Sequence, residues 1–414
     1  MDVYFSIQEC GLKCEIYTDR KYKKYFNKDV AARRISGAPF DKDALDVDCV
    51  DSGLVAVDIK NGAFGIFDKN DSLVPSSIQL RGKSGQFIPR VKNLDVADSA
   101  DQAIFLGNIY PHFGHFLLEH LNRAWGLGRV YKKGMKAIFI DNKNIGAQKF
   151  VFDFTDMLGI ARSDVLILNK SVRFKRVYVP AQSWVTKRRA NTDFCKAFDA
   201  MAENVPDYDM GNKIYVSRAA LSAEMKVYGE ERIQKIFEKN GYRVIYPEKL
   251  PLAHQAAIIK NAKCLAGCGG TALHLALFMR PGGRVIQIKR NSGVKDNGPI
   301  QWMLNTVRGL DSVFIQASVE KRVTEHNSKL PQIIGVTKYM RRFFDDNGFK
   351  YDAGDLSENK SAQKSYDVAL AAASAATGGA IYIKFKRFLI KFVSCLVPGR
   401  VRRGRVRAWM KERL

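Results

Sequence analysis

The sequence lacks any run of about 18 apolar residues, which is the minimum for a membrane-spanning helix. Its first residues also lack the basic start and the continuous apolar core of a secretory signal peptide. The seven cysteines are odd in number and scattered, which is typical of free thiols in a reducing compartment and not of a disulfide framework. These absences predict a cytoplasmic protein that does not span a membrane.

Acidic residues are few relative to basic ones. The chain has 42 Asp and Glu against 67 Lys and Arg, which gives a net charge of +25. Such a charge predicts attraction to polyanions, whether nucleic acid, anionic lipid or a phosphorylated substrate. Apolar residues at 46% and charged residues at 26% are close to globular averages, which argues against a largely disordered chain.

The order of apolar segments indicates the fold class. From residue 103 onward, strand-like runs alternate with amphipathic helical segments, which is typical of a parallel sheet with crossover helices. The polar stretch PDYDMGN at residues 206–212 interrupts the series, which restarts at KIYVSR. Because 414 residues exceed one usual domain, we expect an α/β fold of two Rossmann-like domains facing a cleft. The expected division is an N-terminal lobe with a β-rich elaboration over 1–205, a C-terminal lobe over 206–350, a linker over 351–379 and a basic amphipathic tail over 380–414.

The densest cluster of reactive side chains is GNIYPHFGHFLLEHLNRAW, at residues 107–125, where a strand end precedes a helix predicted near 114–130. His115 and Glu119 are four residues apart, so they share one helix face. The positive end of the helix dipole favours a neutral imidazole at His115, which can accept a proton. Together with His112, this pair forms a candidate proton-handling site, whereas His120 lies on another face and is expected to be structural.

Two other interpretations of this cluster remain open. The histidines could simply cap and pack the start of the helix. His112, His115 and Glu119 are also chemically suitable zinc ligands, but their spacing matches no established zinc motif, so no metal is expected.

The second motif is KIYVSR, in which Ser217 and Arg218 stand at the end of a predicted strand. A guanidinium and a hydroxyl in this position can hold a diphosphate, and Lys226 adds positive charge. The alternative is an ordinary surface arginine in a loop.

The third motif is CLAGCGGTALHLALFMRPGGRVIQI, at residues 264–288. Gly267, Gly269 and Gly270 allow backbone N–H groups to approach an anion, and Thr271 opens a helix predicted near 271–279 whose dipole favours negative charge. The letters GCGG fit neither GxGxxG nor the Walker pattern, which argues against a dinucleotide oxidoreductase or a P-loop NTPase. The glycines could instead permit close helix–strand packing.

These three motifs, in this order, resemble glycosyltransferase family 61 over about residues 100–320. HFGHFLLEHLNRAW, IYVSR and CGGTALH followed by LALFMRPGGRVIQI carry the resemblance. It implies a GT-B fold, inversion at the anomeric carbon, a nucleotide-sugar donor held mainly by the C-terminal lobe, and no obligatory metal or other cofactor. The family includes bacterial capsular polysaccharide proteins, so a capsule, lipopolysaccharide or related glycan is the expected acceptor.

The resemblance also implies roles for individual residues. The inverting reaction that it implies needs a general base to deprotonate the acceptor hydroxyl; cleft position and the helix dipole make His115, supported by Glu119, the candidate, and an acidic residue from the N-terminal region is the alternative. Arg218 would stabilise the leaving diphosphate in place of a metal. The predicted donor-binding set is Ser217, Arg218, Lys226, Tyr246, Glu248, Gly267, Gly269, Gly270, Thr271 and His274. The family pattern is not matched at Cys268, His274 and Gln287, so the donor's identity stays open.

The last residues combine apolar and basic character. Residues 378–414 contain eleven Lys and Arg and one acidic residue, Glu412. As a helix, 380–397 has an apolar face and a basic face, which is typical of a segment lying in the interface of an anionic membrane. We therefore expect peripheral attachment to the inner face of the plasma membrane and a glycan or lipid-linked glycan acceptor. Docking to a protein partner and nucleic-acid binding through this tail are the alternatives.

A nicotinamide-dependent oxidoreductase is disfavoured, because VIQIKRN supplies no acidic residue to hold a ribose after the glycine loop.

Overall fold

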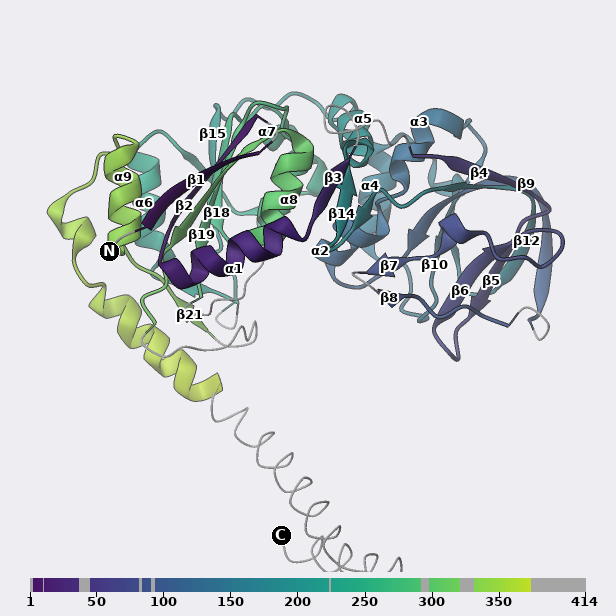
Figure 1. Ribbon diagram of the computed structural model, residues 1–414, viewed down its shortest axis with the longest axis horizontal. Helices are drawn as coiled ribbons and strands as arrows, with labels where there is room; N and C mark the ends of the chain where they lie inside the picture. The colour runs from purple at the N-terminus through teal and green to yellow at the C-terminus, as the bar shows by residue number, and fades with distance from the viewer. Residues whose placement is uncertain are drawn as a thin grey trace, which may run out of the picture.

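The computed structural model describes residues 3–9, 11–36, 45–81, 84–90, 94–222, 225–291, 298–320 and 331–373. The tail predicted at 380–414 and the end of the predicted linker lie outside the described residues. Two large sheets occupy opposite ends of the molecule, and helices flank each of them (Figure 1). The predicted α/β class with parallel sheets is confirmed.

The first sheet has the strand order β11-β10-β9-β12-β5-β6, and β4 also pairs with β12. Strands β11, β10, β9 and β12 are mutually parallel, whereas β4, β5 and β6 join by antiparallel pairing. The strands are β4 Val47–Asp51, β5 Leu54–Asp58, β6 Ala63–Phe67, β9 Val96–Asn108, β10 Lys136–Ile140, β11 Val165–Leu168 and β12 Ser171–Pro180. Near-continuous apolar runs such as AIFLG in β9 suit strands that are buried on both faces.

The second sheet has the strand order β1-β2-β20-β19-β18-β15-β17. All neighbours from β2 to β17 are parallel, and β1 pairs antiparallel with β2 at the edge. The strands are β1 Val3–Glu9, β2 Leu12–Thr18, β15 Lys213–Val216, β17 Arg243–Ile245, β18 Cys264–Cys268, β19 Arg284–Lys289 and β20 Asp311–Gln316. The strand–helix alternation predicted after residue 212 therefore produces the expected parallel sheet.

The prediction that residues 1–205 form one lobe is wrong at its N-terminal end. Strands β1 and β2 extend the second sheet through β20, and the helix α1 that follows packs Phe26 against Phe314 with ring centroids 5.0 Å apart. The physical reason is long-range: β20 offers an open apolar edge that the residues of β2 cover. In Figure 1, β1, β2 and α1 lie with the second sheet, far from β9 and β12.

The predicted linker is also partly wrong. Residues 360–373 are helical, and Tyr366 packs with Tyr228 and Ile333 while its hydroxyl donates to Glu320 at 2.9 Å. The stretch contains five Ala and two Lys, which are good helix formers, and Tyr366 gives it a docking contact.

The described α-helices are α1 Arg20–Ala31, α2 Phe113–His115, α3 Leu127–Val130, α4 Lys149–Met157, α5 Lys196–Asn204, α6 Glu230–Lys239, α7 Leu252–Lys260, α8 Gly298–Arg308 and α9 Lys338–Asp346. Of these, α1, α5 and α8 were not predicted, and the helices predicted near 114–130 and 271–279 differ in type. The segment predicted near 271–279 is a 3₁₀ helix, η8 Thr271–Phe278.

The helix predicted near 114–130 is interrupted. After α2, residues Phe116–His120 form a π-helical turn, η3, and the short elements η4 Ala124–Gly126 and α3 follow. At the end of β9, Gly107 has φ +137°, and a Cβ atom there would lie 2.1 Å from the carbonyl oxygen of His120. This close approach accompanies the departure from α-helical geometry, and π-turns of this kind are frequent at functional sites.

A small sheet, β13-β14-β3, lies between the two large ones, and β3 and β14 run side by side there (Figure 1). Its strands are β3 Arg34–Ser36, β13 Trp184–Val185 and β14 Arg189–Asn191. A single hydrophobic cluster also continues from one lobe to the other, for example where Phe198 of α5 meets Phe278 of η8 at 5.4 Å. The lobes are thus held together by both backbone pairing and apolar packing.

Candidate functional site

A cavity of about 840 Å³ lies where the two lobes meet. Segments that follow the carboxyl ends of β9, β15 and β18 supply much of its lining, which is where open α/β folds place their ligands. Its lining residues include Arg81, His112, His115, Glu119, Thr186, Lys187, Arg218, Lys226, Gly270, Thr271, His274, Gln287 and Arg290. The structure therefore brings motifs from all three predicted clusters into one cavity.

His115 and Glu119 contact one another as their spacing predicts. The Nδ1 atom of His115 lies 3.3 Å from Oε2 of Glu119, whose other oxygen lies 3.3 Å from Nε of Arg81. The carboxylate is nearly buried at 7% exposure, whereas the His115 side chain retains 33%. Burial raises the pKa of Glu119, but hydrogen bonds from His115 and Thr186 and the charge of Arg81 outweigh it, and the net pKa lies below its usual value.

His112 stands directly before α2, with its ring centroid 5.0 Å from that of His115. Burial and the neighbouring charge of His115 lower the pKa of His112. His112 therefore favours the neutral form beside the His115–Glu119 pair.

His120 turns away into the first lobe. Its Nδ1 atom is 2.6 Å from Oδ1 of Asn108, its ring stacks on Tyr110, and burial lowers its pKa to about 3. The predicted structural role agrees with these contacts.

Arg123 holds the backbone around this site through hydrogen bonds. Its buried guanidinium donates to the carbonyls of Ser76 at 2.6 Å and Ile78 at 3.1 Å and to Gln79 at 2.9 Å. Gln79 in turn donates to the backbone carbonyl of Glu119. Arg123 thus fixes the segment that leads to Arg81 relative to the His115–Glu119 pair.

On the opposite side of the cavity, Arg218 and Arg290 flank the glycine loop. A Cβ atom on Gly270 would lie 3.0 Å from Nη1 of Arg218, and Nε of Arg290 donates to the carbonyl of Gly269 at 2.7 Å. Burial and the like charge of Arg218 lower the pKa of Arg290 to about 10. Nη2 of Arg218 donates to the carbonyl of Met225 at 3.2 Å. The buried Nε of Arg218 has no hydrogen-bond partner among the described residues.

A buried carboxylate holds the backbone of Arg218. Its N–H donates to both oxygens of Glu230 at 3.2 Å, and the hydroxyl of Tyr215 donates to one of them at 3.2 Å. Burial raises the pKa of Glu230 to about 7. Cys268, one of the departures from the family pattern, lies buried beside this carboxylate and not among the cavity-lining residues.

The glycines of the third motif serve different purposes. A Cβ on Gly267 would lie 2.5 Å from the carbonyl oxygen of Val216, and one on Gly269 would lie 2.9 Å from Nε2 of Gln287. These two positions are required by packing, which was the alternative interpretation, whereas Gly270 lines the cavity beside Arg218. The packing interpretation therefore holds for Gly267 and Gly269, whereas the approach of an anion at Gly270 stays a prediction.

Thr271 and His274 of η8 complete this wall. Thr271 lies directly against the first lobe, since a Cβ on Gly114 would be 2.9 Å from its Cγ2 atom. Nδ1 of His274 is 2.8 Å from Oε1 of Gln301, and burial lowers the pKa of His274 to about 4. Lys226 lines the cavity while pairing with Glu231 at 2.7 Å.

A second cavity of about 770 Å³ shares Arg218 with the first. Ser217 and Glu248 line it, together with Phe113 and Phe150 from the first lobe. The Ser217 hydroxyl accepts from the backbone of Ala219 at 3.1 Å. These two predicted donor-site residues therefore lie next to the main cavity, on the other side of Arg218.

Tyr246 is not placed with the predicted set. Its hydroxyl bonds to Gln234 at 3.2 Å and its ring lies under the ammonium of Lys249, so neither cavity is lined by it. Tyr246 directly follows β17, and this position places its side chain against α6.

The cavity residues that the sequence did not predict include Arg81, Thr186, Lys187 and Arg290. Arg290 was weighed only as evidence against a dinucleotide site, although its position after β19, at the carboxyl edge of the sheet, was an available signal. Arg81 ends the short strand β7 Leu80–Arg81 and Lys187 lies in the turn between β13 and β14, and both reach the cavity only through tertiary packing. Lys187 has a left-handed backbone, φ +63°, which is uncommon for a non-glycine residue and clusters at functional sites.

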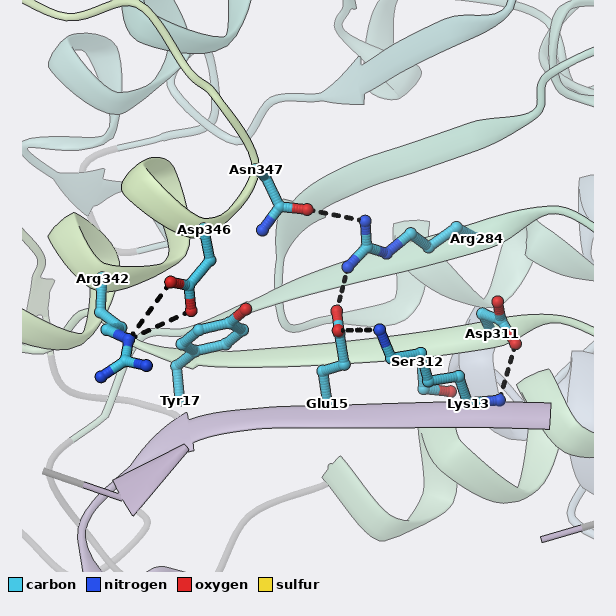
Figure 2. Close-up of a pocket in the computed structure, with 9 residues that line it drawn as sticks. All are labelled: Lys13, Glu15, Tyr17, Arg284, Asp311, Ser312, Arg342, Asp346 and Asn347. Atoms are coloured by element: carbon cyan, nitrogen blue, oxygen red, sulfur yellow. Dashed lines mark hydrogen bonds and ion pairs between the residues drawn. The ribbon is translucent and has the colours of Figure 1, made fainter. Parts of the chain in front are cut away.

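Another cavity, of about 510 Å³, lies at the opposite, amino-terminal edge of the second sheet (Figure 2). Its charged groups largely satisfy one another: Glu15 pairs with Lys13 and Arg284, and Arg342 pairs with Asp346 at 3.1 Å. Such a self-neutralised surface offers no free charge for a ligand, so the interlobe cavity is the better candidate.

Two kinds of feature are absent from the described part of the chain. No group of three or more His, Cys, Asp or Glu residues there is arranged to hold a metal ion. Likewise, none of the helices within it is long and apolar enough to cross a membrane.

An α/β cleft that joins a His–Glu pair to two arginines beside a glycine loop is typical of an enzyme that transfers a group from a phosphorylated donor. Residues 113–286 match the family model of Glycosyltransferase 61. The predicted resemblance to this family is confirmed over that segment, which contains IYVSR and most of the other two motifs, and the protein is a glycosyltransferase.

Other comparisons add little. Among solved structures, the chain is similar to the dodecameric iron-containing heptosyltransferase TibC in complex with ADP-D-β-D-heptose, with 10% identity over 85% of this chain and 98% of that one. The TM-score of 0.25 is too low to show a common fold. No curated protein matches the chain.

Proposed function

We propose that this protein is an inverting, metal-independent glycosyltransferase of GT-B architecture, which moves a sugar from a nucleotide-sugar donor to a glycan acceptor. Membership of family 61 supports the reaction class. The two sheets with the cavity between them support the architecture.

The observation that carries the proposal is the environment of Arg218. Its buried Nε donor has no partner among the described residues, it stands beside Gly270 and Arg290, and it lines both interlobe cavities. An unsatisfied buried donor is costly, and a second guanidinium nearby adds repulsion, so the arrangement is completed by an anion. A diphosphate bridging the two cavities meets both requirements.

On the acceptor side, His115 is the general base. Because Glu119 accepts the hydrogen bond from Nδ1, the tautomer leaves Nε2 free to take a proton. As Nε2 takes the proton of the acceptor hydroxyl, that oxygen forms a bond to the anomeric carbon of the donor. The bond from this carbon to the diphosphate oxygen breaks on the opposite face, which inverts the configuration.

The leaving diphosphate gains negative charge as its bond breaks. Arg218 and Arg290 lie where they can balance that charge, with the backbone at Gly270 and Thr271 as additional donors. These cations take the role that a divalent metal has in other transferases. The second cavity, with Ser217 and Glu248, is assigned to the nucleoside.

A capsular, lipopolysaccharide or related glycan is the proposed acceptor, reached at the inner face of the plasma membrane. The positive charge of residues 378–414 supports attachment to an anionic surface.

A thermal-shift screen of the full chain tests the donor assignment. UDP-, GDP-, CMP- and dTDP-linked sugars are compared with NAD and a DNA duplex, each with and without EDTA. Saturable stabilisation by one nucleotide sugar, kept in EDTA, is expected. Arg218→Ala should abolish it, whereas Arg243→Ala, an exposed arginine of the same sheet, should not. Stabilisation by DNA or NAD alone, or only with a divalent metal, would overturn the proposal.

A further inference from the structure

His274 is held by a chain of buried hydrogen bonds. Its Nδ1 atom lies 2.8 Å from Oε1 of Gln301. The amide nitrogen of Gln301 donates to Oδ1 of Asn305 at 2.8 Å, and the amide nitrogen of Asn305 donates to the Ser312 hydroxyl at 2.9 Å. Gln301, Asn305 and Ser312 are all buried, so polar side chains connect η8 through α8 to β20 in the interior of the second lobe.

These bonds fix the tautomer of His274. The amide nitrogen of Gln301 also donates to the backbone carbonyl of Leu273 at 3.2 Å, and a carbonyl only accepts, so the amide oxygen is the atom that faces the imidazole. An amide oxygen likewise only accepts, which assigns the proton of the neutral ring to Nδ1. Burial lowers the pKa of His274 to about 4, so the ring is neutral near pH 7. Nε2 of His274 therefore carries a lone pair and no hydrogen.

Nε2 is accessible from the main cavity. His274 lines that cavity, and its side chain is only partly buried. Within the ranges that the structure describes, Nε2 has no hydrogen-bond partner, yet it is not one of the buried polar atoms left unpaired there. The cavity wall thus presents a hydrogen-bond acceptor at this point.

The 3₁₀ geometry of η8 aligns His274 with Thr271, because residues three apart in such a helix lie directly above one another. Thr271 packs on the first lobe at Gly114, where an added Cβ would also lie 3.5 Å from Cε1 of His112. In addition to burial, the charges of His112 and His115 lower the pKa of His274, so both rings are close to it. His274 therefore lies one helical turn from the proposed diphosphate site and near the proposed base.

We propose that His274 recognises the transferred sugar, with Nε2 accepting a hydrogen bond from one of its hydroxyl groups. The inference rests on the proposed transfer reaction. In that reaction the anomeric carbon lies between the diphosphate and the proton acceptor, so the sugar ring occupies the cavity beside His274. A lone pair repels the oxygens of a phosphate or carboxylate, whereas a hydroxyl donates to it. His274 thus favours a sugar with a hydroxyl at this position over a deoxy sugar or a uronic acid.

The same contacts argue against two other roles. The low pKa that burial gives His274 makes it a weak base near neutral pH, so it is a poor substitute for His115. A purely structural role uses only Nδ1, which holds Gln301, and leaves Nε2 without a task.

Two conservative variants separate the two ring nitrogens. In His274→Asn, the amide nitrogen takes the place of Nδ1 and still donates to Gln301, but nothing replaces Nε2. In His274→Gln, the longer side chain brings an amide oxygen to the place of Nε2, but the bond to Gln301 is lost. Sugar recognition predicts that the first variant loses affinity and the second loses thermal stability. A purely structural role predicts that the first variant behaves as wild type in both respects.

The affinities are measured by calorimetric titration of the full chain. The probes are the UDP-, GDP-, CMP- or dTDP-linked sugar that stabilises the chain and the matching nucleotide without its sugar. His274→Asn should bind the nucleotide sugar about fivefold to tenfold more weakly and the free nucleotide as wild type does, because only the sugar reaches Nε2. His274→Gln should bind the nucleotide sugar more tightly than His274→Asn. His254→Asn, an exposed histidine on α7, should match wild type.

Monodeoxy and monodeoxyfluoro forms of the same nucleotide sugar identify the hydroxyl and the direction of its hydrogen bond. Neither hydrogen nor fluorine on carbon donates a hydrogen bond. At the recognised position, both replacements should therefore weaken binding to the wild-type chain about fivefold to tenfold. In His274→Asn the same replacements should have little effect, because their partner is already absent.

Equal loss of nucleotide-sugar and free-nucleotide binding in His274→Asn would assign the residue to the diphosphate, and unchanged binding would make it a packing residue. Deoxy penalties that persist in His274→Asn would show that another group recognises the hydroxyl. Each of these results overturns the inference. Failure of every nucleotide sugar to stabilise the wild-type chain would instead overturn the proposed transfer reaction.

Discussion

The imidazole of His115 and the carboxylate of Glu119 face one another across one helical turn, with Nδ1 and Oε2 3.3 Å apart. Arg81 and Thr186 contact the same carboxylate, so the group that holds the imidazole is itself fixed by side chains from two other segments. Trp184 extends this support, because its indole N–H donates to the Thr186 hydroxyl at 3.0 Å.

Replacing His115 by Ala should lower kcat by about 10²- to 10⁴-fold, the usual contribution of a general base. Nucleotide-sugar binding should persist, because the substitution leaves Arg218 and Arg290 in place. The measurement is transfer rate and thermal shift side by side. His254→Ala, an exposed histidine on α7, is the matched control. Wild-type turnover by the His115 variant would remove this residue from the mechanism.

Gly114→Ala tests the contact between the lobes. The added methyl group would lie 2.9 Å from Cγ2 and 3.0 Å from Oγ1 of Thr271, so one lobe must shift. Overpacking of this kind typically destabilises by about 1–3 kcal/mol. Thermal denaturation should show that loss, and adding Thr271→Ala should recover much of it.

Gly128→Ala is the control for that substitution, since a Cβ there meets no atom within 4 Å. It should leave stability unchanged or slightly higher. Equal effects at both glycines would contradict a specific lobe contact.

Glu230 gives the stability an unusual pH dependence. Its folded-state pKa, about 7, lies above the ordinary value of 4.5, so its protonated form is favoured in the fold. Its contribution to the free energy of unfolding is fully present below pH 4.5 and is lost as pH rises through 7, at up to about 1.4 kcal/mol per pH unit.

Glu230→Gln removes this titration, so the variant's stability relative to wild type should rise between pH 4.5 and 7. Chemical denaturation at several pH values measures the difference. Glu238→Gln, on the exposed face of the same helix, controls for the loss of a negative charge. A difference that stays constant with pH would show that Glu230 does not titrate in this window.

Arg123 is expected to be a structural requirement of the site. Arg123→Met strands the carbonyls of Ser76 and Ile78 and the amide of Gln79, and each buried group left unsatisfied costs about 1–3 kcal/mol. Urea denaturation should show a large loss of stability. Arg129→Met, an arginine of the same region whose side chain is 41% exposed, should have a much smaller effect.

The basic tail, outside the described residues, is tested on lipid vesicles. The full chain should sediment with vesicles containing phosphatidylglycerol and release as salt rises, because each basic residue near the surface contributes about 1 kcal/mol. A variant with the tail's last basic residues changed to Gln should stay in the supernatant; these are Arg400, Arg402, Arg403, Arg405, Arg407, Lys411 and Arg413. Equal sedimentation with neutral vesicles, or preferential binding to DNA, would contradict membrane attachment.

The sequence predicted the parts of the site that depend on local pattern. The spacing of His115 and Glu119 gave their contact, and the strand–loop order placed Arg218 and Gly270 at one edge of the second sheet. It did not predict Arg81, because a short strand from a distant segment carries it to Glu119 only after folding. The π-turn at Phe116–His120 was likewise hidden, since the carbonyl that approaches Gly107 lies thirteen residues along the chain.

The sequence also did not predict which strands pair over long distances in the chain. Nothing local in LKCEIYT indicates which sheet its strand joins, and a β-rich start followed by α/β alternation suggested an elaboration of the nearest lobe. The decisive partner is β20, which lies across almost the whole chain. Residues 360–373 are a second case in which a long-range contact decides the structure. The composition that suggested a linker also suits a helix once Tyr366 has a surface to pack on.

The pairing of β2 with β20 has a consequence for synthesis. The backbone N–H of Lys13 donates to the Asp311 carboxylate at 2.7 Å, across 298 positions of sequence. A ribosome releases β1 and β2 before every strand of the first sheet, yet their partner strand ends only at Gln316. During translation the apolar face of this hairpin stays uncovered while the whole first lobe is made, so the second sheet closes late. A chain stopped before β20 therefore leaves an aggregation-prone edge exposed.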